Sequence, residues 1–270
     1  MAITIIVGLP RRGKTIHMTY LATQEMFNRE RIVKMHTEIE RLNQGGFNLS
    51  KPRHPVVANF DIVAHKFGYT PRLSRKINPY RLGYVNERVE VHFLPPYSAV
   101  FITEGQKYLD SRMSNKGYPE WQSRWYEQHG HNNLDIFIDC QRFDLIDKNI
   151  RELASVIEIE SVEYKSDGYT TKTIWKLKRY ENHKAYEQGH GKAETIVANY
   201  DVRRNYDHQS CKPKHYEVYL QNRHDFDLTE HEPLQHTIDG YIRKLTLEDD
   251  EYPVGFYGER GDKIRKSFWS

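Results

Sequence analysis

The sequence predicts an α/β protein with a mainly parallel sheet, followed by a β-hairpin extension and a polar C-terminal tail. Up to about Ser155, short apolar runs rich in β-branched residues alternate with helical segments, which is typical of a parallel sheet covered by helices. Two long alternating segments then flank Ser166-Asp167-Gly168, which predicts a hairpin. The expected parts are a core at 1–155, the hairpin extension at 156–222 and a charged appendage at 223–270.

Composition indicates a polar but globular chain. Of its 270 residues, 29% are charged and 38% hydrophobic, and the 13% that are aromatic supply core material and argue against disorder. The formal net charge is only +3, so any contact with nucleic acid must come from a local surface. Cys140 and Cys211 lie far apart, so we expect a reducing compartment and no disulfide framework. No stretch approaches the roughly 20 apolar residues of a membrane-spanning helix, and the N-terminal apolar run is too short for a signal peptide.

The first element is a short strand that leads into a phosphate-binding loop. Ile3 to Val7 is apolar and β-branched, as a buried parallel strand should be. The next eight residues fit the pattern of a Gly, four variable residues and Gly-Lys-Thr. Glycines let the backbone N–H groups approach phosphate, the lysine reaches the β- and γ-phosphates, and the threonine hydroxyl binds Mg²⁺. The expected nucleotide-binding residues are Gly8, Leu9, Pro10, Arg11, Arg12, Gly13, Lys14 and Thr15.

An amphipathic helix is predicted from about Lys14 to Asn28. Its positive N-terminal end faces the loop and adds to phosphate binding. The strand before the loop and the helix after it make the motif specific; the alternative is a strand–turn–helix with a chance Lys-Thr. Arg11 and Arg12 occupy the variable part of the loop, where they are candidates for contact with nucleotide, a neighbouring subunit or DNA.

The segments that follow the first helix predict less regular structure. Arg29 to Pro55 is polar and predicts a loop with one helical turn at 37–43, and Pro55 to Asn59 predicts a core strand. Tyr69 to Asn86 is basic and interrupted by proline, which indicates an exposed insertion, with DNA contact as the alternative. Val89 to Phe93 predicts another short strand.

The apolar run at 99–102 predicts a buried strand that ends in Thr103-Glu104. A phosphate loop supports hydrolysis only with a group near Mg²⁺ and a group that polarises the attacking water. Most such proteins have an aspartate where Thr103 stands, and a neutral hydroxyl can hold a metal-bound water but neutralises no charge. Glu104 is the candidate general base, with a strand-ending role as the alternative.

Polar side chains also follow the strand predicted at Leu134 to Ile138. Gln141 is a candidate to sense the γ-phosphate or orient water. Asp139 falls on the same face of a regular strand and could supply the carboxylate missing at position 103, although an aspartate at a strand end is also a common turn former.

Three further helices are predicted, at 107–113, 118–128 and 145–153. Candidate arginine fingers lie in or between these helices, and a possible metal site lies after them. The arginines that could act as fingers across a subunit interface, each with a surface or ion-pair role as the alternative, are Arg112, Arg124, Arg142 and Arg151. The spacing His208-x2-Cys211-x3-His215 is a weak zinc signal, because it lacks a Cys-x2-Cys pair. Lys214 to Leu220 predicts one more strand.

Several motifs, taken in order, resemble the Zot-like (zonular occludens toxin-like) family, the assembly ATPases of filamentous bacteriophages. The resemblance covers roughly residues 1–220. Beyond the phosphate loop, it rests on Asn59, Glu104-Gly105-Gln106, Arg112, His129-Gly130, Gln141, Ile146-Asp147 and Ile150-Arg151. The sequence departs from the family at Thr103, where the family has Asp, and at Gln128, where the family often has Arg.

The resemblance implies a RecA-like core of the additional-strand type and ATP-driven assembly or export of single-stranded DNA virions. The phosphate loop itself predicts ATP and Mg²⁺ as ligands, and an arginine finger acting across a subunit interface would imply a homo-oligomer such as a ring. The resemblance adds phage DNA or other assembly proteins as expected partners. The membrane-spanning helix that commonly follows this domain is absent from the sequence. We therefore expect the host cytoplasm, with the inner membrane reached through a partner or a missing segment.

The sequence thus predicts a Mg²⁺-dependent ATPase for virion assembly, DNA export or packaging. Lys14, Glu104 and Gln141 are the expected catalytic residues, and Thr15 and Thr103 are the expected metal-side residues. One alternative is a nucleotide-binding scaffold or switch with little hydrolysis, which Thr103 favours. The other is a small-molecule kinase, for which the basic segment at 69–86 would have to serve as a lid.

Overall fold

The computed structural model describes residues 2–46, 49–64, 72–77, 79, 82–85, 90–92, 94–110 and 120–206. Several sequence-based predictions therefore lie outside the described residues. These are the strand at 214–220, the possible zinc ligands His208, Cys211 and His215, the charged appendage at 223–270, and Arg112.

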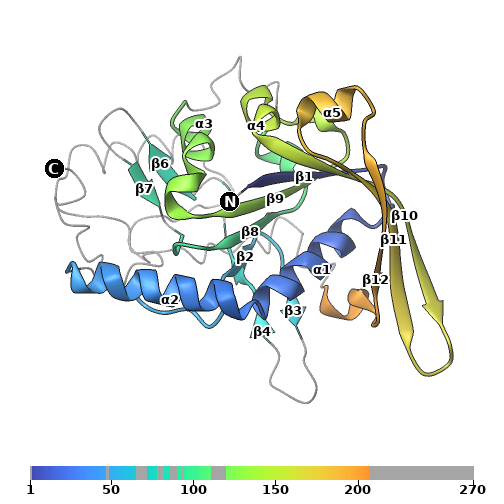
Figure 1. Cartoon of the computed structure of the whole chain (residues 1–270), viewed down its shortest axis with the longest axis horizontal. Helices are drawn as coiled ribbons and strands as arrows, with labels where there is room; N and C mark the ends of the chain where they lie inside the picture. The colour runs from blue at the N-terminus through green and yellow to red at the C-terminus, as the bar shows by residue number, and fades with distance from the viewer. Residues whose placement is uncertain are drawn as a thin grey trace, which may run out of the picture.

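The core is an eight-stranded sheet in the order β12-β11-β10-β1-β9-β8-β2-β5 (Figure 1). The strands from β10 to β5 in this order pair in parallel, and β11 and β12 continue the sheet in antiparallel fashion. Their bounds are β1 (Ile3–Val7), β2 (Val56–Ala58), β5 (Arg75–Lys76), β8 (Ala99–Ile102), β9 (Asp135–Cys140), β10 (Ala154–Ser166), β11 (Thr171–Tyr180) and β12 (Lys192–Ala198). Two small antiparallel pairs stand apart, β3 (Val63–Ala64) with β4 (Arg72–Leu73) and β6 (Gly83–Val85) with β7 (Glu90–His92).

The strand order confirms the predicted α/β fold with an additional strand. Strand β9 lies between β1, which carries the phosphate loop, and β8. The predicted hairpin is also present, because β10 and β11 pair over most of their length and project beyond the body of the molecule (Figure 1). The boundary expected between residues 155 and 156 falls inside β10, whose first half is a core strand parallel to β1.

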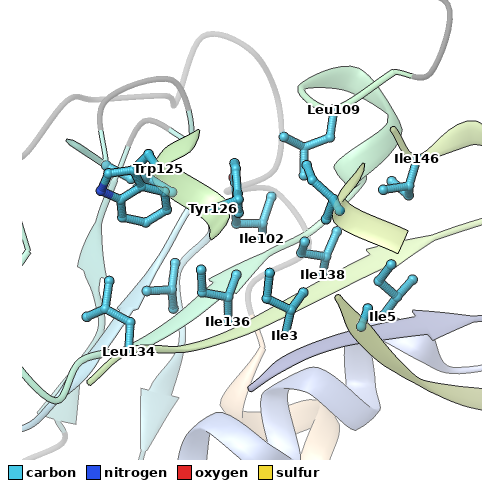
Figure 2. Packing of buried hydrophobic residues seen from close by; sticks show 14 of the residues in the cluster. Ile3, Ile5, Ile102, Leu109, Trp125, Tyr126, Leu134, Ile136, Ile138 and Ile146 are labelled. Carbon is cyan, nitrogen blue, oxygen red and sulfur yellow. The ribbon is translucent and has the colours of Figure 1, made fainter. Parts of the chain in front are cut away.

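Helices cover both faces of this sheet and separate two apolar cores. Helix α1 (Lys14–Met26) lies on one side, whereas α3 (Glu120–Glu127), α4 (Lys148–Glu152) and α5 (His183–Glu187) lie on the other (Figure 1). Alternation along β9 shows the division, because Ile136 and Ile138 pack on the α3 side (Figure 2) and Phe137 packs on the α1 side. Every second residue of β9, counted from Phe137, therefore faces α1.

The segment after α1 is a helix and not the predicted loop. Helix α2 spans Arg29–Gln44, and the Asn28 side chain caps it by accepting a hydrogen bond from the Arg31 N–H. Only Met35 and Ile39 of this helix are buried, so its apolar signal in the sequence is small. The expectation of a loop with a single turn was wrong.

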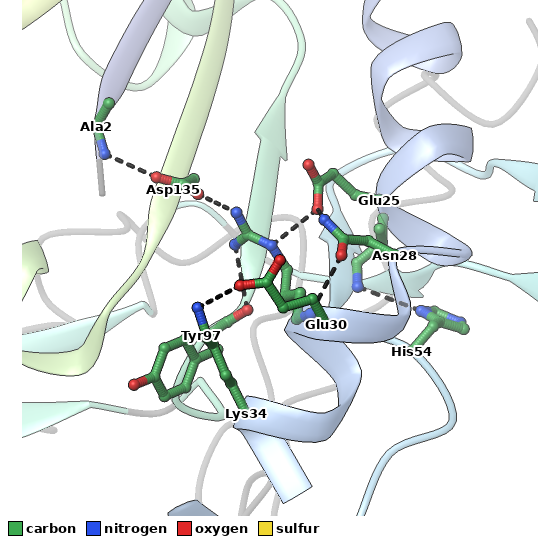
Figure 3. A network of polar contacts seen from close by, with 10 residues as sticks. Ala2, Glu25, Asn28, Glu30, Lys34, His54, Tyr97 and Asp135 are labelled. Carbon is green, nitrogen blue, oxygen red and sulfur yellow. Dashed lines mark hydrogen bonds and ion pairs between the residues drawn. The ribbon is translucent and has the colours of Figure 1, made fainter.

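Arg31 ties the start of α2 to the sheet through a polar network (Figure 3). Its guanidinium binds the carboxylates of Asp135 and Glu25 and donates to the Tyr97 carbonyl. Asp135 in turn accepts a hydrogen bond from the Ala2 N–H at 2.7 Å. The network lies where β9 begins, at the edge of the sheet opposite the carboxyl ends of its parallel strands.

Two other segments also differ from the sequence-based prediction. The sequence from Tyr180 to Ala193 is polar and predicts a loop, but it contains α5 and the start of β12. The helix expected from Lys107 is replaced up to Asp110 by a 3-10 turn at Gly105–Lys107 and a bridge between Asp110 and Ile146. None of the helices in the described ranges has the length and apolar character needed to cross a membrane.

Candidate nucleotide-binding site

The phosphate loop joins the carboxyl end of β1 to the start of α1, as the sequence predicts. Gly13 has φ +84, a conformation that side-chain-bearing residues rarely adopt. A Cβ atom at Gly13 would lie 2.7 Å from a Val162 methyl carbon, and one at Gly8 would lie 2.8 Å from the Ile159 carbonyl oxygen. Both glycines are therefore required by the close approach of the loop to β10.

Arg12 fastens the loop to the same strand. Its Nη1 donates a 2.8 Å hydrogen bond to the main-chain carbonyl of Glu160. Glu160 lies where the pairing of β10 with β11 shifts register, between Ile159 and Ser161. Arg12 thus has a partner within its own chain, whereas Arg11 is exposed and has a positive φ of 63°.

The loop and the start of α1 are suited to an anion. Lys14 Nζ donates to the Leu9 carbonyl at 3.2 Å, so the lysine lies over its own loop. Gly13 caps α1 without a side-chain hydrogen bond, and no acidic residue occupies the first turn. The first N–H groups of the helix and its positive dipole end therefore face the loop without a competing anion from the helix's own first turn.

Thr103 and Glu104 follow β8 at the same edge of the sheet. Glu104 has a left-handed backbone conformation, with φ 53° and ψ 46°. Its carboxylate pairs with Lys107, and its side chain is 42% exposed. Asn59, which follows β2, binds both main-chain polar atoms of Thr103, with Thr103 N–H to Oδ1 at 2.8 Å and Nδ2 to the Thr103 carbonyl at 3.1 Å. These two contacts of Asn59 were not predicted from the sequence.

Asp139 brings β9 into the same site. Its Oδ2 accepts hydrogen bonds from the hydroxyls of Thr15, at 2.9 Å, and Thr103, at 3.0 Å, while its Oδ1 accepts from the Glu104 N–H at 2.8 Å. The side chain is buried. Burial raises the pKa of Asp139 above its ordinary value, against the opposing effect of these three hydrogen bonds and of the Lys14 charge.

Gln141 lies one residue beyond β9 and its side chain is exposed. It is therefore at the correct edge of the sheet, next to the end of β1, as expected from the sequence. The turn at His129–Asn132 instead precedes β9 and lies at the opposite edge. Among the finger candidates, Arg142 pairs with Asp144, Arg151 lies over the Phe143 ring at 5.5 Å, and Arg124 lies on α3.

The donors at this edge fit Mg²⁺. Magnesium takes oxygen ligands, keeps several waters, and is usually held by one or two carboxylates together with substrate phosphates. The hydroxyls of Thr15 and Thr103 meet one carboxylate here, beside the start of α1. Across the described ranges, no group of three or more His, Cys, Asp or Glu residues is placed to hold a metal ion by itself.

Comparison with known proteins gives one family and several solved structures. The family described as zonular occludens toxin (Zot) matches residues 2–209. The N-terminal domain of zonular occludens toxin from Neisseria meningitidis is similar at 19% identity and TM-score 0.43, over 76% of this chain and 98% of that one. The genome packaging NTPase B204 of Sulfolobus turreted icosahedral virus 2, in complex with sulfate, is similar at 10% identity and TM-score 0.33, over 72% and 94%. No curated protein matches.

Proposed function

The chain belongs to the zonular occludens toxin (Zot) family, and from this premise we propose that it is a P-loop ATPase that hydrolyses ATP with Mg²⁺ to power phage virion assembly, DNA export or packaging. One observation carries the proposal. The phosphate loop, Glu104 and the polar group at Asp139 all meet at the carboxyl edge of one parallel sheet. Ligands of open α/β sheets bind at this edge.

Each residue has a distinct task in the proposed reaction. The loop N–H groups and Lys14 bind the phosphates and hold the γ-phosphoryl group in line with the attacking water. Glu104 accepts the proton of the attacking water, and its present partner Lys107 has to release it for that step. Gln141 senses the γ-phosphate. Thr15 and Thr103 would hold Mg²⁺, which when bound neutralises charge on the phosphate oxygens.

Phosphate release from ATP tests the proposal. We expect Lys14→Ala to lose both nucleotide binding and turnover, and Glu104→Gln to keep binding while turnover falls by about 10²-fold or more. Matched controls are Lys148→Ala and Glu152→Gln, because these two residues form an exposed ion pair on α4. Wild-type turnover no higher than that of Lys14→Ala or Glu104→Gln would contradict the proposal that the protein hydrolyses ATP.

The second candidate function is a nucleotide-dependent scaffold or switch in the same assembly machinery. Thr103 favours it, because the hydroxyl that follows β8 supplies no charge at the position where a carboxylate is usual. Tight nucleotide binding with negligible turnover, also in the presence of DNA, would select this function over the ATPase.

We further propose a homo-oligomer with phage DNA or other assembly proteins as partners, in the host cytoplasm at the inner face of the inner membrane. A partner or a further segment would provide the membrane contact. Membership of the family supports this setting. Sizing with and without a non-hydrolysable ATP analogue tests it, and a monomer under both conditions would contradict the oligomer.

A further inference from the structure

Asp139 brings a buried carboxylate to the side chain of Thr103, although the two residues follow different strands of the sheet. Strands β8 and β9 pair in parallel with Ile102 beside Ile138, so the next residue of each strand, Thr103 and Asp139, are also neighbours. Each lies two residues after a phenylalanine, Phe101 or Phe137, that packs on the α1 side, so both side chains also face α1. Their side chains therefore meet in front of the first turn of α1, where Thr15 lies.

The contacts of Asp139 suit a charged acceptor. Its two carboxylate oxygens accept hydrogen bonds from three donors. These donors are the Thr15 hydroxyl, the Thr103 hydroxyl and the Glu104 N–H. A buried carboxylate is costly unless it is paired or binds a metal. Within the described part of the chain, no ion pair to Asp139 is formed, and Lys14 is the cation whose charge acts on it. The carboxylate is thus satisfied by hydrogen bonds but lacks a direct cationic partner.

We propose that Asp139 is the carboxylate that helps to hold Mg²⁺ at this site, and that from β9 it replaces the carboxylate that is usual at the position of Thr103. The inference rests on the proposed nucleotide-binding function. Adjacent strands are about 4.8 Å apart, and the 3.0 Å contact between Thr103 Oγ1 and Asp139 Oδ2 shows that the two side chains lean toward a common point. A carboxylate on either strand would therefore serve the same Thr15 hydroxyl.

Asp139 also positions the candidate base. Its Oδ1 binds the Glu104 N–H, and Glu104 has a left-handed conformation that is costly for a residue with a side chain. One carboxylate thus links the hydroxyl of the phosphate loop to the backbone of Glu104. Metal binding and the position of the base are coupled through one residue of β9.

Asp139→Asn separates charge from structure. The amide oxygen can accept from the Glu104 N–H, and the amide NH₂ can donate to the two hydroxyls, so all three hydrogen bonds have replacements. We expect this variant to fold and to melt at or above the wild-type temperature without nucleotide, because a buried charge is removed. Asp167→Asn, at the exposed tip of the hairpin, is the matched control.

The decisive measurement is the effect of Mg²⁺ on the affinity for a non-hydrolysable ATP analogue, by calorimetry with Mg²⁺ or EDTA. We expect Mg²⁺ to strengthen wild-type binding and Asp139→Asn to reduce that gain about tenfold or more, with the affinity in EDTA little changed. An unchanged Mg²⁺ gain in folded Asp139→Asn would overturn the inference while leaving the proposed function intact. Absence of any analogue binding by the wild type would instead count against the proposed function.

Moving the carboxylate from β9 to the position of Thr103 gives a second test. Asp139→Thr alone should lose the Mg²⁺ gain, and Thr103→Asp combined with Asp139→Thr should recover part of it, because the carboxylate returns to β8. Thr103→Asp alone places two carboxylates in contact and should lower the melting temperature without Mg²⁺. A folded double variant whose Mg²⁺ gain stays as low as that of Asp139→Thr would contradict the view that a carboxylate at either position can serve the metal.

Discussion

Asn59 extends the pairing of β2 and β8 by one step through its side chain, which binds both the N–H and the carbonyl of Thr103. The last backbone pair of these strands joins Ala58 to Phe101, and the Asn59 N–H adds a 3.1 Å bond to the Phe101 carbonyl. Asn59 and Thr103 are both buried. The peptide immediately before Glu104 is therefore held by a side chain and not by solvent.

Replacing Asn59 by Leu should lower both stability and turnover. Leucine has a similar size but leaves the Thr103 N–H and carbonyl without their partner, which costs about 2 kcal/mol of unfolding free energy. Because Glu104 follows this peptide, we expect turnover at saturating ATP to fall by about tenfold or more, with analogue affinity less affected. Asn205→Leu is the control, because Asn205 is also buried but lies against Thr23 of α1. Equal losses of turnover in both variants would indicate a general loss of stability.

Gly13→Ala should weaken the phosphate loop for two separable reasons. The φ of +84° costs a side-chain-bearing residue about 1–2 kcal/mol, and the new methyl group would overlap Val162. Adding Val162→Ala removes the two methyl carbons at 2.7 and 3.3 Å but leaves the Val162 Cβ at 2.8 Å and the backbone strain, so we expect it to recover only part of the stability and analogue affinity. Gly168→Ala provides the strain alone, because its φ is +90° and no atom lies within 4 Å of the place that its methyl group would take. Denaturant unfolding and calorimetry give the two readouts.

Arg31→Met should destabilise the protein without changing the nucleotide site. Arg31 and Asp135 have side chains that are 15% and 18% exposed, so removal of the arginine leaves a largely buried carboxylate with the Ala2 N–H but without the guanidinium, at a cost of about 2–4 kcal/mol. Although burial of Asp135 acts to raise its pKa, the hydrogen bond and charge of Arg31 outweigh it and hold that pKa below its ordinary value.

The matched control for Arg31→Met is Lys34→Met, one turn later on α2. Lys34 pairs with Glu30 in solvent, and exposed pairs contribute little to stability. We expect a lower denaturant midpoint for Arg31→Met alone, with unchanged analogue affinity in the folded protein. A similar midpoint for both variants would show that the contacts of Arg31 with the sheet and with Glu25 do not stabilise the fold.

The central strands and the phosphate loop were predictable because their signals are local. Strands β1, β8 and β9 are short apolar runs buried on both faces, and the loop has a fixed spacing of glycines, lysine and threonine. Helix α2 was not predictable in the same way, because only two of its residues are buried and its surface is highly charged. Strand β12 was missed for a related reason, since this edge strand is largely exposed.

The meeting of Asp139 with Thr103 depends on strand order. The two residues are 36 positions apart, and nothing in their spacing says that β9 pairs with β8 as well as with β1. Sequence alone therefore suggested a spare carboxylate near the site without fixing its partners. The same holds for Arg12, whose bond to Glu160 requires β10 to pass beside the loop.

His17 should make the protein sensitive to mild acid. The ring is fully buried on α1 between Tyr20 and Trp175, and in the described part of the structure neither ring nitrogen has a hydrogen-bond partner. Burial, and then the charge of Arg179, lowers the pKa of His17 from 6.5 to about 3. The folded state therefore favours the neutral ring, and its contribution to stability is complete above pH 6.5 and is lost as the pH falls toward 3.

His17→Phe should remove this acid sensitivity. Linkage predicts that the wild type loses about 2 kcal/mol of unfolding free energy between about pH 7 and pH 5 through this residue alone. Phenylalanine keeps a ring against Trp175 and removes two unpaired polar atoms, so we expect equal or higher stability at neutral pH and a smaller loss in acid. Urea unfolding at both pH values measures the difference, with His190→Gln as the control because His190 is exposed. An acid-induced loss that is the same in His17→Phe and the wild type would show that another group governs the acid response.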